Sequence, residues 1–337
     1  MPQTLRERQP IHAGYPLMCT LDGIDLSQGI LRRRAGRGWS YRGPQGRILD
    51  PDVRARINAL AIPPAYSDVW INPDPDADLQ AMGRDALGRK QYIYHPHWQA
   101  RQADRKFAQL TEFAAALPTL RSQVLADRRS PVMSRRWVLA LMVTILDRAH
   151  IRVGSESYRK LNGTRGLTTL TGRHLRIEGA KMTFAFPGKS GQARKIVLRD
   201  APLAQALSHL HGGPRTPLFR YREGRYVNRL TAQDLNAYLQ SIVGEQMSAK
   251  TFRTWGGTVL CAAAARKVAR SGRVLDAVEA VATHLGNTPS VARESYIHPR
   301  VLEHLERDAN IDLRTSRPVF GRRTLSVTEQ DVKVLID

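Results

Sequence analysis

The chain has 337 residues, 42% hydrophobic and 24% charged, which fits a folded protein with one large domain or two ordinary ones. Its 52 lysines and arginines exceed its 30 acidic residues by 22, and this surplus favours a polyanionic partner such as nucleic acid. The most apolar run, Trp137–Leu146, is too short to cross a bilayer, and no long basic amphipathic segment favours a membrane surface. Cys19 and Cys261 lack metal-ligand spacing, and the N-terminus lacks the apolar core of a signal peptide, so we expect a soluble cytoplasmic protein with reduced thiols.

The first hundred residues predict a small β-rich domain. Residues 1–20 are expected to form a loosely held arm. Gly38–Tyr41 and Tyr66–Ile71 combine aromatic and β-branched residues next to glycine and proline, which is typical of short strands separated by turns. Asp52–Leu60 predicts one short helix, and Gly88–Tyr94 predicts a further strand.

Residues 88–94 form the most suggestive segment of this domain. Period-two alternation gives the strand two faces, one with Arg89, Gln91 and Ile93 and the other with Lys90, Tyr92 and Tyr94. Basic, amide and aromatic groups on an extended segment suit a strand that lies against DNA and reaches phosphates and base edges. The alternative is an edge strand whose tyrosines pack on the core and whose cations are solvated.

Residues 101–337 predict a larger, mainly helical domain, so the fold class is α+β. The expected helices cover Trp98–Ala116 (ending near Pro118), Ser134–Arg148, Ala232–Val243, Ser248–Arg270 and Leu275–Leu285. A further helix is expected to begin at Thr288-Pro289 and to carry Tyr296. Ser326–Glu329 is expected to open a C-terminal helix.

A strand interlude separates the helices of this domain. Leu167–Leu170 predicts one strand, and Lys181–Phe186 and Lys195–Leu198 predict a hairpin around the turn Pro187–Gly191.

A tyrosine beside arginines on a strongly basic chain suggests attack on a phosphodiester. A phenol with an ordinary pKa of about 10 is mostly protonated at neutral pH. It therefore needs fixed cations on the non-bridging oxygens, an acid for the leaving oxygen, and a rigid in-line geometry. Arg152, Lys189 and Arg253 are candidates for these roles, and guanidinium groups fit phosphate oxygens without a metal. Taken singly, each is more commonly a solvated surface residue, and a tyrosine at a helix end is more commonly part of the core.

Taken together, these residues occur in a characteristic order. The order of Arg152, Lys189, Lys250-x-x-Arg253 and Tyr296 resembles that of type IB DNA topoisomerases, and the likeness is greatest to the short poxvirus-like enzymes of bacteria. The motifs that carry the resemblance are Gly88–Tyr94, Ile151–Gly154, Gly166–Leu170, Lys250–Trp255 and Ser295–Pro299.

The resemblance implies a role for each matching residue. Tyr296 would be the nucleophile that forms a 3′-phosphotyrosyl link, with Arg152 and Arg253 clamping the scissile phosphate. Lys189 would be the general acid for the leaving 5′ oxygen, and Lys250 an auxiliary basic residue. The segment with Arg89, Lys90, Gln91, Tyr92 and Tyr94 would touch the DNA major groove.

The same resemblance implies how the whole protein works. A β-rich domain over residues 1–100 and a catalytic domain over residues 101–337 would clamp double-stranded DNA. The protein would be a nucleoid-associated cytoplasmic monomer that relaxes supercoils without ATP, metal or any other cofactor.

One position departs from the family pattern. Many relatives carry a histidine nine residues before the tyrosine, where this chain has Asn287. An asparagine donates a hydrogen bond but carries no charge, so we expect a weaker and less pH-sensitive contribution there. His284 is a possible substitute, although it is more simply a core or surface histidine; His298 is expected to touch DNA or cap a helix.

Two alternative functions remain open from the sequence. A tyrosine site-specific recombinase uses the same attack, but it usually shows His-x-x-Arg where this chain has Lys250-x-x-Arg253, and it ends with a helix that docks onto a neighbouring protomer. A non-catalytic DNA-binding protein would not need the tyrosine, the arginines and the lysine in this order.

Overall fold

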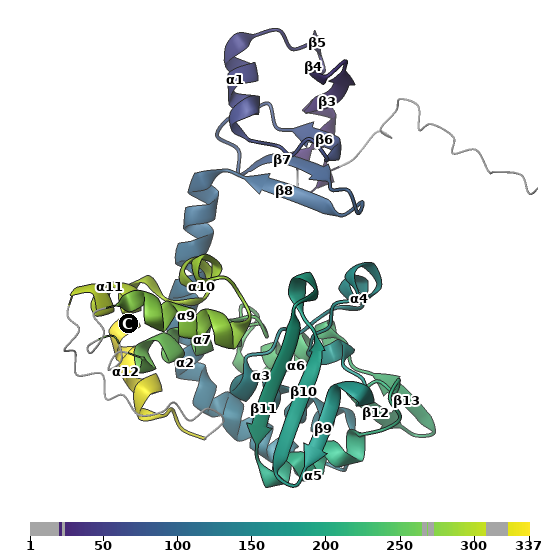
Figure 1. Ribbon diagram of the computed structural model, residues 1–337, viewed down its shortest axis with the longest axis vertical. Helices are drawn as coiled ribbons and strands as arrows, with labels where there is room; N and C mark the ends of the chain where they lie inside the picture. Colours follow the sequence, from purple (N-terminus) through teal and green to yellow (C-terminus); the bar gives the residue numbers. More distant parts are fainter. Residues whose placement is uncertain (1–19, 22–23, 265–267, 269–272, 308–322) are drawn as a thin grey trace, which may run out of the picture. The chain divides into compact units, whose positions relative to one another are not determined.

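The computed structural model describes residues 20–21, 24–264, 268, 273–307 and 323–337 (Figure 1). The expected N-terminal arm, residues 1–20, lies outside the described residues except for Thr20. The end of the expected helix Ser248–Arg270 also lies largely outside them, since residues 265–267 and 269–270 are not described. The chain divides into two compact units, Met1–Gln102 and Ala103–Asp337. Sheets and helices are both present, which confirms the mixed α+β class.

The first unit is built on an antiparallel sheet of six strands in the order β5-β4-β3-β6-β7-β8. The strands are β3 (Ile30–Ala35), β4 (Gly38–Gly43), β5 (Gly46–Arg47), β6 (Ser67–Ile71), β7 (Leu79–Arg84) and β8 (Lys90–Tyr94), and a separate pair joins β1 (Thr20–Leu21) to β2 (Ile24–Asp25), which precedes the 3-10 turn η1 (Leu26–Gln28).

Helix α1 (Pro51–Ala59) supplies the second layer of this unit. The Asp50 side chain caps the helix by accepting hydrogen bonds from the backbone N–H groups of Asp52 and Val53. Ile57 on the helix is buried in one cluster with Ile71 on β6, so burial of apolar side chains holds helix and sheet together.

The second unit is mainly helical. Its helices are α2 (Pro96–Asp127, which begins in the first unit), α3 (Arg135–Ala149), α4 (Glu156–Asn162), α5 (Ala201–Leu210), α6 (Ala232–Val243), α7 (Thr251–Ala263), α9 (Val274–Leu285), α10 (Pro289–Tyr296), α11 (Pro299–Arg307) and α12 (Val327–Ile336). Helix α3 is buried from Trp137 through Asp147 and forms the centre of the core. Helices α7, α9 and α10 pack against one another (Figure 1).

Five strands and three short 3-10 turns complete the second unit. They are β9 (Leu175–Glu178), β10 (Lys181–Pro187), β11 (Ala193–Arg199), β12 (Arg220–Glu223) and β13 (Tyr226–Arg229), with η2 (Leu167–Thr169), η3 (Gly172–His174) and η4 (Lys189–Gly191). Strands β10 and β11 are antiparallel and η4 forms the turn between them, which confirms the expected hairpin.

Three expectations about local structure were wrong. Helix α2 does not end near Pro118 but continues to Asp127, because Leu117, Leu120 and Val124 remain buried and their packing outweighs the one backbone hydrogen bond that proline cannot make. Residues 167–169 form a 3-10 turn and not a strand. Helix α7 begins at Thr251 and not after a Ser248 cap.

The C-terminal helix α12 is fixed to the same chain by buried charges. Arg121, 4% exposed, donates to Asp147 at 2.8 and 2.9 Å and to Glu329 on α12 at 2.8 and 3.2 Å. Glu329, 0% exposed, also accepts from the Trp255 indole at 3.2 Å. These bonds join α12 to α2 and α7 within one chain.

Candidate active site

Tyr296 is the last residue of α10. The helix starts where the sequence predicts it, because the Thr288 hydroxyl caps the Val291 N–H at 3.3 Å and Pro289 occupies the first turn. Gly257 on α7 leaves room for the tyrosine, since a Cβ on that glycine would lie 2.5 Å from the Tyr296 carbonyl oxygen. The tyrosine is half-buried at this contact.

Arg253 lies in the first turn of α7 and is 3% exposed. Its Nη1 donates to the His150 carbonyl at 2.6 Å and its Nη2 to the Leu285 carbonyl at 3.0 Å, which fixes the plane of the guanidinium. Its Cζ is 5.0 Å from the centre of the Tyr296 ring. The buried Nε has no acceptor among the described residues.

Arg152 and Asn287 meet beside this arginine. Arg152 donates through Nη2 to the Gly286 carbonyl at 3.0 Å and to Oδ1 of Asn287. Because Oδ1 accepts this bond, the amide nitrogen of Asn287 is left as a donor, and it is buried without an acceptor in the described part of the chain. The site therefore contains two buried donors, Arg253 Nε and Asn287 Nδ2, that lack partners.

The loop that carries Arg152 is held by the turn η2. Leu167 N–H donates to the Arg152 carbonyl at 2.8 Å, and the Thr168 hydroxyl donates to the Gly154 carbonyl at 3.2 Å. Gly154, at φ +79°, packs so closely on Gly166 that a Cβ there would lie 2.7 Å from the Gly166 Cα.

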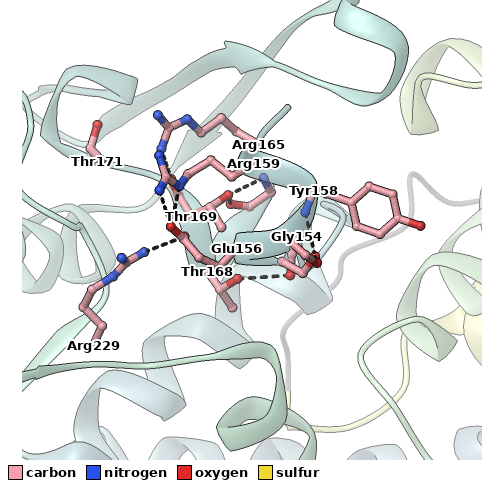
Figure 2. A network of polar contacts seen from close by, with 12 residues as sticks. Gly154, Glu156, Tyr158, Arg159, Arg165, Thr168, Thr169, Thr171 and Arg229 are labelled. Atoms are coloured by element: carbon pink, nitrogen blue, oxygen red, sulfur yellow. Dashed lines mark hydrogen bonds and ion pairs between the residues drawn. The ribbon is translucent and has the colours of Figure 1, made fainter. Parts of the chain in front are cut away.

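Charged side chains hold the segment that follows this loop. Figure 2 shows Arg159 and Arg229 converging on Glu156, at 2.8 and 3.4 Å. These bonds lower the pKa of Glu156 to about 2, the bond from Arg159 being the main cause.

Sequence reasoning missed Arg194 on β11. Its guanidinium donates to the carbonyls of Thr283 at 3.2 Å and His284 at 2.6 Å, the last turn of α9. It lines a small pocket together with Arg152, Arg253 and Arg165. The pocket therefore concentrates positive charge, and no local signal in the sequence distinguishes Arg194 from the other basic residues of the chain.

The cations of the site act on the phenol of Tyr296. Burial alone would raise the pKa of Tyr296, but the charge of Arg253 and its short-range polar interaction with the phenol, followed by the charges of Arg152 and Lys250, outweigh burial and lower the pKa from its ordinary value of 10.0. Burial, followed by the nearby charge of Arg152, lowers the pKa of Arg253 to about 10, so the Arg253 guanidinium stays charged at neutral pH. The phenolate form is thereby stabilised where it would attack a phosphate.

The two expected lysines lie at the surface. Lys189 is exposed in η4, at the tip of the hairpin, and its ammonium has no hydrogen bond or ion pair with the described residues. Lys250 is exposed at the start of α7 and acts on Tyr296 through its charge. The structure therefore brings Tyr296, Arg152, Arg253 and Asn287 together and leaves Lys189 outside this group.

The histidines near the site have structural partners. Nε2 of His284 lies 3.0 Å from Nδ1 of His150, and burial is the first cause that lowers the pKa of His284 to about 4. Nδ1 of His298 accepts the Arg300 N–H at 3.1 Å, so His298 caps the start of α11, one of its two expected roles. Among the described residues, no cluster of three His, Cys, Asp or Glu side chains could hold a metal ion.

Comparison with known proteins assigns the chain to a family. The model of the eukaryotic DNA topoisomerase I catalytic core matches residues 95–315, and that of the bacterial DNA topoisomerase IB N-terminal domain matches residues 38–85. A DNA topoisomerase 1B of Acanthamoeba polyphaga mimivirus is 30% identical over 332 residues, which cover 92% of this chain and 98% of that protein. The chain belongs to the type IB DNA topoisomerases. Together these matches support the poxvirus-like bacterial kind expected from the motifs.

Solved structures similar to this topoisomerase include two complexes of the XerH site-specific recombinase with DNA. The post-cleavage complex on a palindromic difH substrate has 16% identity and a TM-score of 0.37, covering 55% of this chain and 49% of the recombinase chain. The pre-cleavage complex on difH has 16% identity and a TM-score of 0.35, covering 57% and 53%. The topoisomerase thus spans about half the length of these recombinase chains.

The expected DNA-facing strand of the topoisomerase is β8, at the edge of the six-stranded sheet. Arg89 and Gln91 both donate to the Asp85 carboxylate, at 2.6 and 2.9 Å. On the other face Lys90 is exposed and Tyr92 is 39% exposed.

Aromatic stacking orders the end of this strand. The ring of Tyr94 stacks on Trp98 with centroids 3.9 Å apart, and on Tyr92 at 6.2 Å.

The described helices of the topoisomerase include none that is long and apolar enough to cross a membrane.

Proposed function

We propose that the enzyme relaxes supercoiled duplex DNA by transient cleavage of one strand, with Tyr296 as the nucleophile. The Tyr296 oxygen would attack the scissile phosphorus and form a 3′-phosphotyrosyl link while the bond to the 5′ oxygen breaks. The phenolic proton leaves to solvent, and the 5′ oxygen receives a proton to become a hydroxyl. Religation reverses these steps, and the phosphotyrosyl link conserves the bond energy in between.

The observation that carries this proposal is the pair of buried donors without acceptors. Buried N–H groups are nearly always paired, so Arg253 Nε and Asn287 Nδ2 call for an acceptor that arrives with a ligand. The neighbouring guanidinium of Arg152 and the charge on Arg253 favour an anion. A phosphodiester brought to the Tyr296 ring would supply acceptors to these donors as negative charge develops in the transition state.

Lys189 is the proposed general acid for the 5′ oxygen. Its exposed position in the turn between β10 and β11 leaves its ammonium free to reach a DNA strand. Lys250 is proposed to contact the DNA backbone and to keep the phenol acidic through its charge.

In the first unit, we propose that β8 lies against the major groove. The exposed side chains of Lys90 and Tyr92 are the ones best placed to touch DNA directly. Arg89 and Gln91 would have to exchange their bonds to Asp85 for bonds to DNA, while the stacked Tyr94 would present the edge of its ring.

A topoisomerase accounts for the chain better than a recombinase does. Lys250 stands where recombinases usually carry histidine, and α12 is bound within its own chain through Glu329 and Arg121. The packing of α12 leads us to propose a monomer. Because its substrate is DNA, we also propose that it acts in the cytoplasm, in association with the nucleoid.

Trapping of the covalent intermediate tests the proposed role of Tyr296. The protein is mixed with duplex DNA, and the reaction is stopped with denaturant. The covalent protein–DNA adduct is then digested, and the peptide that carries the nucleotide is sequenced by mass spectrometry. The proposal predicts a link between Tyr296 and a DNA 3′ end. A link to another residue, or to a 5′ end, would contradict it.

A further inference from the structure

Helix α10 ends without the usual backbone cap. Ile297, the residue after Tyr296, is extended at φ −119° and ψ 130° and not left-handed, so it does not form the glycine-type cap that satisfies the last carbonyls of many helices. The carbonyl groups of the last turn therefore need partners from elsewhere. The carbonyls concerned include those of Glu294 and Ser295, which directly precede Tyr296.

Lys106 on α2 supplies a partner to both carbonyls. Its Nζ lies 3.2 Å from the Ser295 oxygen and 3.4 Å from the Glu294 oxygen, 189 and 188 residues away along the chain. A cation at the C-terminal end of a helix also interacts favourably with the helix dipole. One side chain thus satisfies the end of the helix that carries the proposed nucleophile.

The position of the ammonium is itself fixed by packing. Nζ of Lys106 lies 4.0 Å from the centre of the neighbouring Phe107 ring, which is 7% exposed and packs edge-on against His298 at 5.1 Å. On the far side of the helix end, the Thr258 hydroxyl lies 3.4 Å from the Tyr296 carbonyl oxygen. The main chain around Tyr296 is held between α2 and α7.

We propose that Lys106 is a positioning residue for DNA cleavage, and that its ammonium fixes the end of α10 so that the Tyr296 oxygen stands in line for attack. This inference rests on the proposed role of Tyr296 as nucleophile. Lys106 does not contact the reacting atoms and acts through the main chain of residues 294–295.

The surroundings of Lys106 make its positioning role depend on pH. Burial, assisted by the charge of Lys250, lowers the pKa of Lys106 to about 8. His298 is neutral there because its own pKa is lowered to about 4, and the Glu294 carboxylate accepts from Ser290 at 3.1 Å. The ammonium is therefore present below pH 8 and is lost as the pH rises through that value.

The test measures single-turnover cleavage of a DNA from which the fragment with the new 5′-hydroxyl dissociates after the cut. Lys106→Met keeps the aliphatic stem over Phe107 but removes the charge and the donors, so the cleavage rate should fall by on the order of 10-fold while DNA affinity is unchanged. Lys106→Arg should restore most of the rate. Lys333→Met, which removes a partly exposed lysine paired with Asp337 on α12, is the matched control and should cleave like wild type.

The pH profile separates positioning from general stability. The ratio of the wild-type rate to the Lys106→Met rate should be largest below pH 8 and shrink above it, because wild type then loses the same charge. A ratio that stays constant with pH, or Lys106→Met cleaving at the wild-type rate, would overturn the inference. Tyr296→Phe tests the underlying proposal independently, since a covalent adduct that survives it refutes the nucleophile assignment whatever Lys106 does.

Discussion

Gly257 offers a sharp perturbation of the proposed nucleophile, because it touches Tyr296 without offering any chemistry of its own. In Gly257→Ala the new Cβ would lie 2.5 Å from the Tyr296 carbonyl oxygen and 3.3 Å from the Tyr296 Cβ. Real Cβ contacts essentially never fall below 3.0 Å, so α7 and the tyrosine main chain must move apart by at least the difference between 2.5 and 3.0 Å. Because Arg253 lies on α7 as well, this shift displaces Tyr296 relative to Arg253.

The size of the effect follows from that displacement. A misplacement of about 1 Å can cost on the order of 100-fold in rate, so a shift of about half that should slow cleavage by roughly 10-fold. The helix itself should not suffer, because alanine is a better helix former than glycine by about 1 kcal/mol. DNA affinity should therefore be unchanged, and the urea midpoint should move little.

The assay is single-turnover formation of the covalent adduct, compared with DNA binding by fluorescence anisotropy. Gly213→Ala is the matched control, since a Cβ there meets only the Thr216 hydroxyl, at 3.5 Å. A wild-type cleavage rate in a folded Gly257→Ala protein would refute the claim that α7 sets the position of Tyr296.

Three further predictions concern the site and its support. Asn287→Ala removes one of the two unpaired donors and should lower the cleavage rate by on the order of 100-fold at unchanged DNA affinity, whereas an unchanged rate would remove Asn287 from the site. Because neighbouring cations lower the pKa of Tyr296 below 10.0, the cleavage rate of Lys106→Met, which has no ammonium at position 106 to lose, should rise with pH as phenolate forms and level off below pH 10; a plateau reached only above pH 10 would contradict this. Glu329→Ala removes one of the two carboxylates that bind the buried Arg121 and should cost about 3 kcal/mol in urea unfolding, against a negligible change for the partly exposed Lys333→Ala.

The elements that the sequence predicted well are those with strong local signals. The capping box of Thr231 and Asp234 sets the start of α6 at the expected residue, and Thr288-Pro289 does the same for α10. The hairpin of β10 and β11 follows from alternation around a glycine-bracketed turn.

Local signals failed where tertiary packing decides. Pro118 looked like the end of a helix, but buried leucines on both sides of it carry α2 onward. The run Leu167–Leu170, with its two β-branched threonines, predicted a strand, but the backbone of residues 167–168 donates hydrogen bonds to the loop that carries Arg152, and residues 167–169 form a 3-10 turn. In both cases, contacts with residues that are distant in the sequence outweigh the local preference for a secondary structure.

The same limit applies to the site. The order of motifs that the chain shares with the family made Tyr296 and its arginines candidates, but no local pattern distinguishes Lys106 or Arg194 from the other basic residues of this chain. Lys106 reaches carbonyls 188 and 189 residues away, and Arg194 reaches carbonyls 89 and 90 residues away. Only the folded chain reveals such pairs.

The most direct test of the central claim is relaxation of a supercoiled plasmid in EDTA without ATP, with wild type and Tyr296→Phe side by side. The proposed mechanism predicts that wild type relaxes the plasmid and, when stopped with denaturant, remains attached to a DNA 3′ end. Both relaxation and attachment should vanish in Tyr296→Phe. Relaxation that persists in Tyr296→Phe, or a wild-type protein that binds the plasmid without relaxing it, would contradict the account.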